Sequence, residues 1–293
     1  MPGEFRPGEG MVLADAVPGE PLIVFKNVTL GFDQGDVLRA ISFEVSPGET
    51  KVLLGESGAG KTLIMKLAAG LLRPDSGKIW VMGRDVTHMT ESELLDFRRH
   101  LGFVFQEGAL FDSMTVGENV AFRLHEENVP ENDIETRVRE ALHFVEMEHA
   151  IDLFPADLSG GMRRRVSIAR ALVDHPAVAL YDSPTAGLDP VTSQTIINLI
   201  LRGRDAQGVT ALLATHRVQD AFGLANYRFD AASRRVIRVN GHAGQFPIPA
   251  MKAEIVPTNI LVLREGRVYF EGSAAEFSRT GESYLKEFLA SAE

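Results

Sequence analysis

Residues 51–62 read Lys51-Val-Leu-Leu-Gly-Glu-Ser-Gly-Ala-Gly-Lys61-Thr62, and this stretch decides the fold. The apolar run that ends at Leu54 predicts a buried strand, and the apolar residues from Leu63 onward predict a helix. Between them stands the pattern G-x-x-x-x-G-K-[ST], with which a phosphate-binding loop joins a strand to a helix. Strand, loop and helix in this order favour a nucleoside triphosphate site over a glycine-rich turn that matches by chance.

Each part of this loop has a chemical reason. The glycines let successive backbone N–H groups point inward as an anion nest, and the N-terminus of the next helix adds partial positive charge. We expect Lys61 to reach the β- and γ-phosphates and the Thr62 hydroxyl to bind Mg²⁺. The predicted nucleotide-binding residues are Gly55, Glu56, Ser57, Gly58, Ala59, Gly60, Lys61 and Thr62.

Composition narrows the class of protein. The chain has 293 residues, 45% hydrophobic and 24% charged, which is ordinary for a globular protein with a sizeable core. Its formal net charge of -10 argues against broad contact with nucleic acid. No apolar run approaches the ~20 residues that span a bilayer, and the N-terminus lacks the features of a signal peptide. The absence of cysteine excludes disulfides and fits a cytoplasmic location.

Strand and helix signals alternate along the rest of the chain. A disordered leader is expected over 1–21, and a capping box at Thr90 predicts a helix as far as Arg99. Residues 115–157 have helical periodicity with a break at Pro130, and Ser159 is expected to cap a helix through Leu172. Its arginine run is interpreted as a solvated helix face. Predicted strands cover 22–25, 41–45, 78–82, 101–105, 178–182, 210–216 and the paired stretch 260–272 with a turn at 265–266. Alternating strands and helices imply a largely parallel sheet with its ligand at the carboxyl ends of the strands.

Five further elements accompany the phosphate-binding loop. In order they are Gln106 after a strand, Leu158-Ser-Gly-Gly-Met162, Asp182 at the end of an apolar strand, Gly187-Leu-Asp-Pro190, and His216 at the end of another. Over residues 22–225 this set resembles the ATP-binding subunit of an ABC transporter. The resemblance implies an α/β P-loop NTPase fold, an ABC-type nucleotide-binding domain with an antiparallel β subdomain and an inserted α-helical subdomain. We expect the ATPase domain at 22–272, its helical signature subdomain at about 107–165, and a helical tail at 273–293.

The resemblance also implies a role for each matching residue, with ATP and Mg²⁺ as cofactors. Asp182 holds Mg²⁺ with Thr62, Gln106 touches the metal and the attacking water, and His216 hydrogen-bonds the γ-phosphate. Ser159, Gly160 and Gly161 face the γ-phosphate held by a second ATPase subunit, so a complete site needs a head-to-tail dimer. Asp189 shapes that dimer contact, and Phe32 stacks on adenine.

The stretch 105–122 and the methionine at 162 resemble the Mla/MCE lipid-transport ATPases, although amino-acid importers share part of this pattern. That resemblance implies an integral membrane permease and an MCE-type substrate-binding protein as partners. It places the chain on the inner face of the plasma membrane. The sequence leaves open the lipid, the direction of transport, and whether the second ATPase subunit is identical.

Two places depart from the family pattern. Ser183 stands where the family has a glutamate that polarises the attacking water, and a serine hydroxyl is too weak a base to replace it. Position 183 is thus a catalytic position without its base, and three interpretations remain. They are a slow natural ATPase, which we favour, a degenerate subunit paired with an intact one, and an engineered substitution. The second departure is an insert at 228–256, predicted as a β-hairpin near Asn240-Gly241 followed by a loop.

Two competing functions follow. The first is a nucleotide-gated clamp that binds ATP with little turnover; Ser183, which is not a base, leaves this hypothesis open. A soluble ABC ATPase acting on ribosomes, DNA or cofactor assembly is disfavoured by the acidic, single-cassette chain.

Overall fold

A six-stranded sheet forms the centre of the molecule. The computed structural model describes residues 19–33, 35–239 and 258–290. The strand order is β12-β11-β3-β8-β7-β6, and all neighbours are parallel except β12, which pairs antiparallel with β11 at the edge. Every residue of β3, β7 and β8 is buried, which explains their continuous apolar runs. The strands are β3 (Thr50–Leu54), β6 (Leu101–Val104), β7 (Val178–Asp182), β8 (Thr210–Thr215), β11 (Thr258–Arg264) and β12 (Arg267–Ser273).

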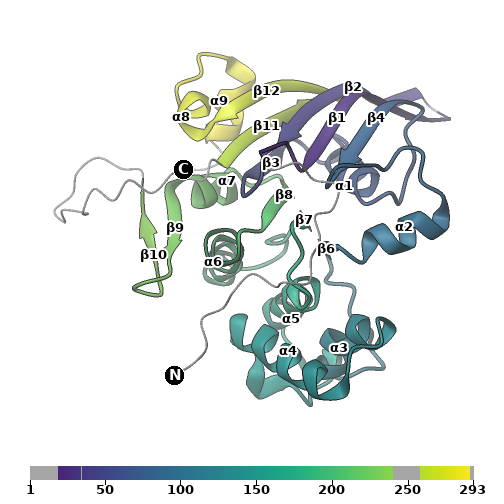
Figure 1. Cartoon of the computed structure of the whole chain (residues 1–293). Helices are drawn as coiled ribbons and strands as arrows, with labels where there is room; N and C mark the ends of the chain where they lie inside the picture. Colours follow the sequence, from purple (N-terminus) through teal and green to yellow (C-terminus); the bar gives the residue numbers. More distant parts are fainter. Residues whose placement is uncertain (1–18, 34, 240–257, 291–293) are drawn as a thin grey trace.

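A second, antiparallel sheet lies above α1 (Figure 1). Its order is β2-β1-β4-β5, and its apolar residues share one core with α1 and one face of the central sheet. Its strands are β1 (Ile23–Phe32), β2 (Gly35–Val45), β4 (Ser76–Val81) and β5 (Arg84–Asp85), and α1 spans Lys61–Ala68. β1 and β2 are longer than predicted, because register shifts let them continue past Asn27 and Ala40, which have positive φ.

Helices α3, α4 and α5 gather away from the antiparallel sheet, at the bottom of Figure 1. The predicted break between two helices is confirmed, since Pro130 is the N-cap of α4. The predicted capping box at Thr90 is also confirmed, at the start of α2. Two short 3₁₀ turns, Glu148–Ala150 and Pro155–Asp157, connect α4 to α5. The helices are α2 (Glu91–Arg98), α3 (Val116–Glu126), α4 (Glu131–Phe144) and α5 (Gly160–Leu172).

A β-hairpin is present at the start of the predicted insert, and its turn precedes the position of Asn240-Gly241. Strands β9 (Tyr227–Asp230) and β10 (Arg235–Arg238) follow α6 (Pro190–Gln207) and α7 (Val218–Asn226), and pair antiparallel. The turn lies at 231–234, where the Asp230 carboxylate accepts hydrogen bonds from the Ser233 N–H and hydroxyl. Asn240-Gly241 and the loop after it lie outside the described residues, as does most of the predicted leader.

The described C-terminal part is helical, as expected for the tail at 273–293. α8 (Ala274–Ser278) begins at a capping box on Ser273, and α9 (Ser283–Ala290) follows it. Within the described ranges, no helix has both the length and the apolar character needed to cross a bilayer.

Gly266 in the β11–β12 turn supports a first prediction. Its φ is +74°, and a Cβ added there would overlap the carbonyl oxygen of Val37. We expect Gly266→Ala to destabilise the protein by about 2–4 kcal/mol, from the left-handed backbone and the clash together. Gly208 is the matched control, because its φ is +71° and nothing lies within 4 Å of an added Cβ. Urea denaturation should show a clearly smaller loss for Gly208→Ala, and equal losses would contradict the prediction.

Candidate functional site

The phosphate-binding loop curls around its own lysine. The Lys61 Nζ donates hydrogen bonds to the carbonyl oxygens of Gly55 at 2.7 Å and Glu56 at 2.8 Å. Gly60 is the N-cap of α1 with φ +98°, and a Cβ there would run into Leu38, so glycine is required. Burial lowers the pKa of Lys61, and the charges of Asp182 and Glu56 oppose that effect. The lysine is therefore held at the loop by carbonyl groups, within reach of an anion bound there.

Two oxygen ligands suited to a divalent cation meet beside this loop. The Thr62 hydroxyl donates to Asp182 Oδ1 at 3.2 Å, although the two residues are 120 positions apart. The Ser183 hydroxyl donates to the same oxygen at 3.3 Å. Asp182 ends β7 and is 4% exposed. A hydroxyl and a carboxylate at the edge of a phosphate-binding loop are the hard ligands that Mg²⁺ prefers, so these residues fit a bound Mg²⁺.

A pocket of about 390 Å³ brings eight of the seventeen predicted site residues together. It lies at the carboxyl ends of the parallel strands, where β7 and β8 end at Asp182 and Thr215. Gln106, Ser183 and His216, which are far apart in the sequence, share it with the phosphate-binding loop. Leu63 and Ala186 also line it and were not predicted. The one signal for them is their position next to two recognised motifs, after Thr62 and before Gly187. The lining residues are Ser57, Gly58, Gly60, Lys61, Thr62, Leu63, Gln106, Ser183, Ala186 and His216.

Position 183 is held tightly although it lacks a carboxylate. Ser183 has φ +48°, and its N–H donates to the Ala214 carbonyl at 2.8 Å. Among the described residues, none that lines the pocket carries a carboxylate, and His216 supplies its one imidazole. The pocket can therefore bind a phosphate chain and a metal, but it offers water no carboxylate base.

The predicted signature residues lie outside this pocket, although Gly160 lines a neighbouring pocket with Gln106 and Ala186. Ser159 caps α5, where its hydroxyl accepts the Met162 N–H at 3.2 Å. A Cβ on Gly161 would overlap the side chain of Thr192, so the N-terminal turn of α5 packs closely against that of α6. Asp189 caps α6, and hydrogen bonds from Thr192 and Val191 lower its pKa. None of Ser159, Gly160, Gly161 and Asp189 lines the pocket of the phosphate-binding loop.

Phe32 also lies outside that pocket. It ends β1 and is 55% exposed. Its side chain is therefore open to solvent in the monomer, and the predicted stacking on adenine would cover it.

The arginine run on α5 is not simply a solvated face, which corrects the sequence interpretation. Arg164 is 6% exposed, and its Nη1 donates to the Phe105 carbonyl, beside Gln106, at 2.8 Å. Arg170 reaches the Gly108 carbonyl at 2.9 Å in the same way. Burial lowers the pKa of Arg164, and the charges of Asp182 and Glu107 raise it. The helix that begins at the signature residues therefore holds the segment on both sides of Gln106 in place.

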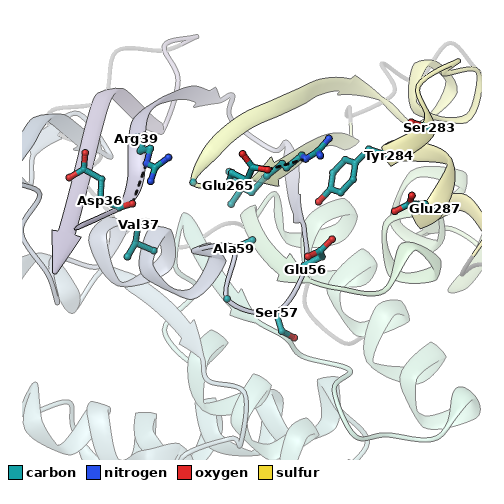
Figure 2. A pocket seen from close by; sticks show the side chains of 14 residues that line it. Asp36, Val37, Arg39, Glu56, Ser57, Ala59, Glu265, Ser283, Tyr284 and Glu287 are labelled. Atoms are coloured by element: carbon teal, nitrogen blue, oxygen red, sulfur yellow. Dashed lines mark hydrogen bonds and ion pairs between the residues drawn. The ribbon is translucent and has the colours of Figure 1, made fainter. Parts of the chain in front are cut away.

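A second pocket of about 730 Å³ lies on the outer side of the phosphate-binding loop (Figure 2). Its walls come from the start of β2, the β11–β12 turn and α9, which contributes Tyr284. Ser57 and Gly58 line both pockets. Glu56 and Ala59 line this second pocket and not the first. Two of the predicted nucleotide-binding side chains thus lie beside the phosphate site rather than in it.

Comparison with known proteins identifies relatives of this arrangement. The family model described as ABC transporter matches residues 38–186. Over 219 residues the chain is 36% identical to the intermembrane phospholipid transport system ATP-binding protein MlaF of Haemophilus influenzae, covering 74% of this chain and 82% of that protein. It is 37% identical over 201 residues to the methionine import ATP-binding protein MetN of Carboxydothermus hydrogenoformans, covering 68% of this chain and 60% of that protein. A solved dimeric, post-hydrolysis state of the ATP-binding cassette MJ0796 with ADP and Pi superposes with a TM-score of 0.70 at 26% identity, covering 86% of this chain and 98% of that one.

Proposed function

Since this chain belongs to the ABC transporter family, we propose that its ATPase activity energises a lipid transporter of the Mla/MCE type. The observation that carries the proposal is the match to the phospholipid transport protein, which extends over most of both chains. Met162 in the signature and the stretch 105–122 also favour the Mla/MCE type, because both resemble that group of ATPases. In this proposal two copies of the chain bind head to tail on the inner face of a membrane, joined to a permease and an MCE-type substrate-binding protein.

In this proposal the residues of the nucleotide pocket, Asp182 beside it and the signature residues have the following roles. Lys61 and the loop N–H groups bind the phosphate chain of ATP. Thr62, Asp182 and Gln106 would hold Mg²⁺, which would neutralise charge on the phosphates. His216 donates a hydrogen bond to the γ-phosphate, and Gln106 orients the attacking water. Ser159, Gly160, Gly161 and Asp189 of the second copy close the site from the opposite side, with the α5 N-terminus facing the phosphate. Because Ser183 offers no base, hydrolysis is slow.

Lys61→Ala is expected to weaken ATP binding about 10- to 100-fold, since it removes a charge-assisted hydrogen bond to phosphate. Isothermal titration with a non-hydrolysable ATP analogue measures this directly. Lys66→Ala is the matched control, because Lys66 lies on the same helix and does not line the pocket. If the Lys61→Ala and unmodified chains bound the ATP analogue with equal affinity, the phosphate-binding loop would not be part of the ATP site and the proposal would be contradicted.

A small-solute importer is the second candidate, because the match to the methionine import protein is of similar strength. Purification of the chain with the permease it binds, followed by reconstitution into vesicles, separates the two. ATP-dependent transfer of fluorescent phospholipid, absent with Lys61→Ala, supports lipid transport. ATP-dependent uptake of methionine without lipid transfer would overturn it. Association with ribosomes or DNA and no membrane protein would overturn both.

A further inference from the structure

A buried carboxylate lies just outside the nucleotide pocket. Asp220, on α7, is 2% exposed. Its Oδ2 accepts a hydrogen bond from the Thr185 hydroxyl at 2.6 Å and another from the Thr215 hydroxyl at 2.7 Å. The nucleotide pocket is lined by neighbours of these threonines, Ser183 and His216, and not by Asp220 itself.

The Thr215 side of this network fixes the turn that carries His216. The Arg217 N–H donates to the Thr215 hydroxyl oxygen at 3.0 Å, so the residues on both sides of His216 are joined to each other. The Arg217 Nε lies 3.8 Å from Asp220 Oδ1, and its Nη1 donates to the Ser193 hydroxyl of α6 at 2.8 Å. The backbone of His216 is therefore anchored at both ends, while its ring is exposed to the pocket.

The Thr185 side fixes the turn after Asp182. The Ala186 N–H donates to the Ser183 carbonyl at 3.0 Å, and the Leu188 N–H donates to the Thr185 carbonyl at 3.2 Å. The regular ladder between β7 and β8 ends at the pair Asp182–Ala214. Beyond that pair β7 ends, whereas β8 continues to Thr215, which pairs with Leu54 of β3. Asp220 joins the turn after β7 to the end of β8 with two short hydrogen bonds.

We propose that Asp220 is a positioning residue, which acts through Thr185 and Thr215 to hold His216 at a fixed place relative to position 183. This inference rests on the proposed function, in which His216 hydrogen-bonds the γ-phosphate. Preorganised donors are effective only when their geometry is held before the reaction. Because Ser183 contributes no carboxylate, turnover in this chain depends on that geometry.

Thr185→Val tests the proposal, because it keeps the shape of the side chain and removes the hydrogen bond to Asp220. We expect kcat to fall about 10- to 100-fold, as small displacements of reacting groups do. KM for ATP and the Kd of a non-hydrolysable analogue should change less than about threefold, since ligand binding by Lys61 and Thr62 is untouched. Thr185→Ser restores the hydroxyl and should restore kcat. Thr195→Val is the control, since Thr195 bonds only its own helix at Val191 in the interactions described.

Two further measurements separate positioning from a purely structural role. In a His216→Ala chain, Thr185→Val should cause no additional loss of kcat, because the residue it positions is gone. The NMR signal of the His216 imidazole, assigned with His216→Ala, should shift or broaden with Thr185→Val and remain unchanged with Thr195→Val. The same loss of kcat in both backgrounds, or an unchanged His216 signal, would overturn the inference.

The imidazole signal also distinguishes failure of the inference from failure of the proposed function. If the unmodified chain hydrolyses no ATP above Lys61→Ala while Thr185→Val still moves the His216 signal, the proposed catalytic use of His216 is wrong and the positioning by Asp220 stands.

Discussion

Ser183→Glu is expected to raise kcat for ATP about 10²- to 10⁴-fold, which is the usual contribution of a positioned general base. The side chain at this position already faces the pocket that holds Gln106 and His216. Ser183 has φ +48°, so glutamate brings no backbone strain that serine does not already bear. KM for ATP should change little, because the phosphate loop and the Mg²⁺ ligands are unaltered.

The controls for this experiment are Ser183→Gln, which has nearly the size of glutamate and no basic group, and Lys61→Ala as the blank. Ser183→Gln should not accelerate turnover. If the unmodified chain equals the blank and Ser183→Glu turns over, the nucleotide-gated clamp becomes the better description. Equal turnover of the unmodified and Ser183→Glu chains, both above the blank, would show that another group orients the water and would contradict slow hydrolysis.

The features that the sequence predicted well have local signals. The apolar runs at 178–182 and 210–215 are buried on both faces and form β7 and β8 within a residue of the prediction. The capping residues Thr90 and Ser159 mark the starts of α2 and α5, because a side-chain oxygen and a backbone N–H three residues later suffice to form the cap. The pocket could be predicted because each of its strands ends at a recognisable motif.

Features that depend on distant partners could not be predicted. Nothing in the run Arg163-Arg-Arg165 indicates that its middle residue meets a carbonyl 59 positions earlier. Asp220 lies four residues after His216, but its partners are two threonines, one in the turn after β7 and one at the end of β8. The hairpin turn was predicted at Asn240-Gly241 because that dipeptide is a strong turn signal. The turn at 231–234 lacks glycine and is held by the Asp230 side chain, a weaker signal.

Arg204→Met is expected to destabilise the protein by about 3–5 kcal/mol, because it removes one partner of a buried ion pair. Arg204 is 5% exposed and pairs with Asp205 at 2.6 Å. It also donates to the Leu224 and Tyr227 carbonyls, at 3.0 and 3.2 Å, and to the Thr258 hydroxyl at 2.9 Å.

The loss should concentrate where these bonds converge, because Arg204 joins α6 to the end of α7, to β9 and to β11. Removing it takes a donor from the Tyr227 carbonyl and the cation from Asp205. The Leu224 carbonyl still accepts the Thr258 hydroxyl at 3.0 Å, and Asp205 still accepts the Phe229 N–H at 2.7 Å. Urea denaturation measures the free energy of unfolding, and limited proteolysis should cut Arg204→Met first within the β9–β10 hairpin. Arg139→Met is the matched control: its pair with Glu135 is 63% and 67% exposed, so it should cost less than about 1 kcal/mol. Similar losses for both variants would show that the buried cluster does not anchor the hairpin, since a surface pair lacks the desolvated carboxylate on which this prediction depends.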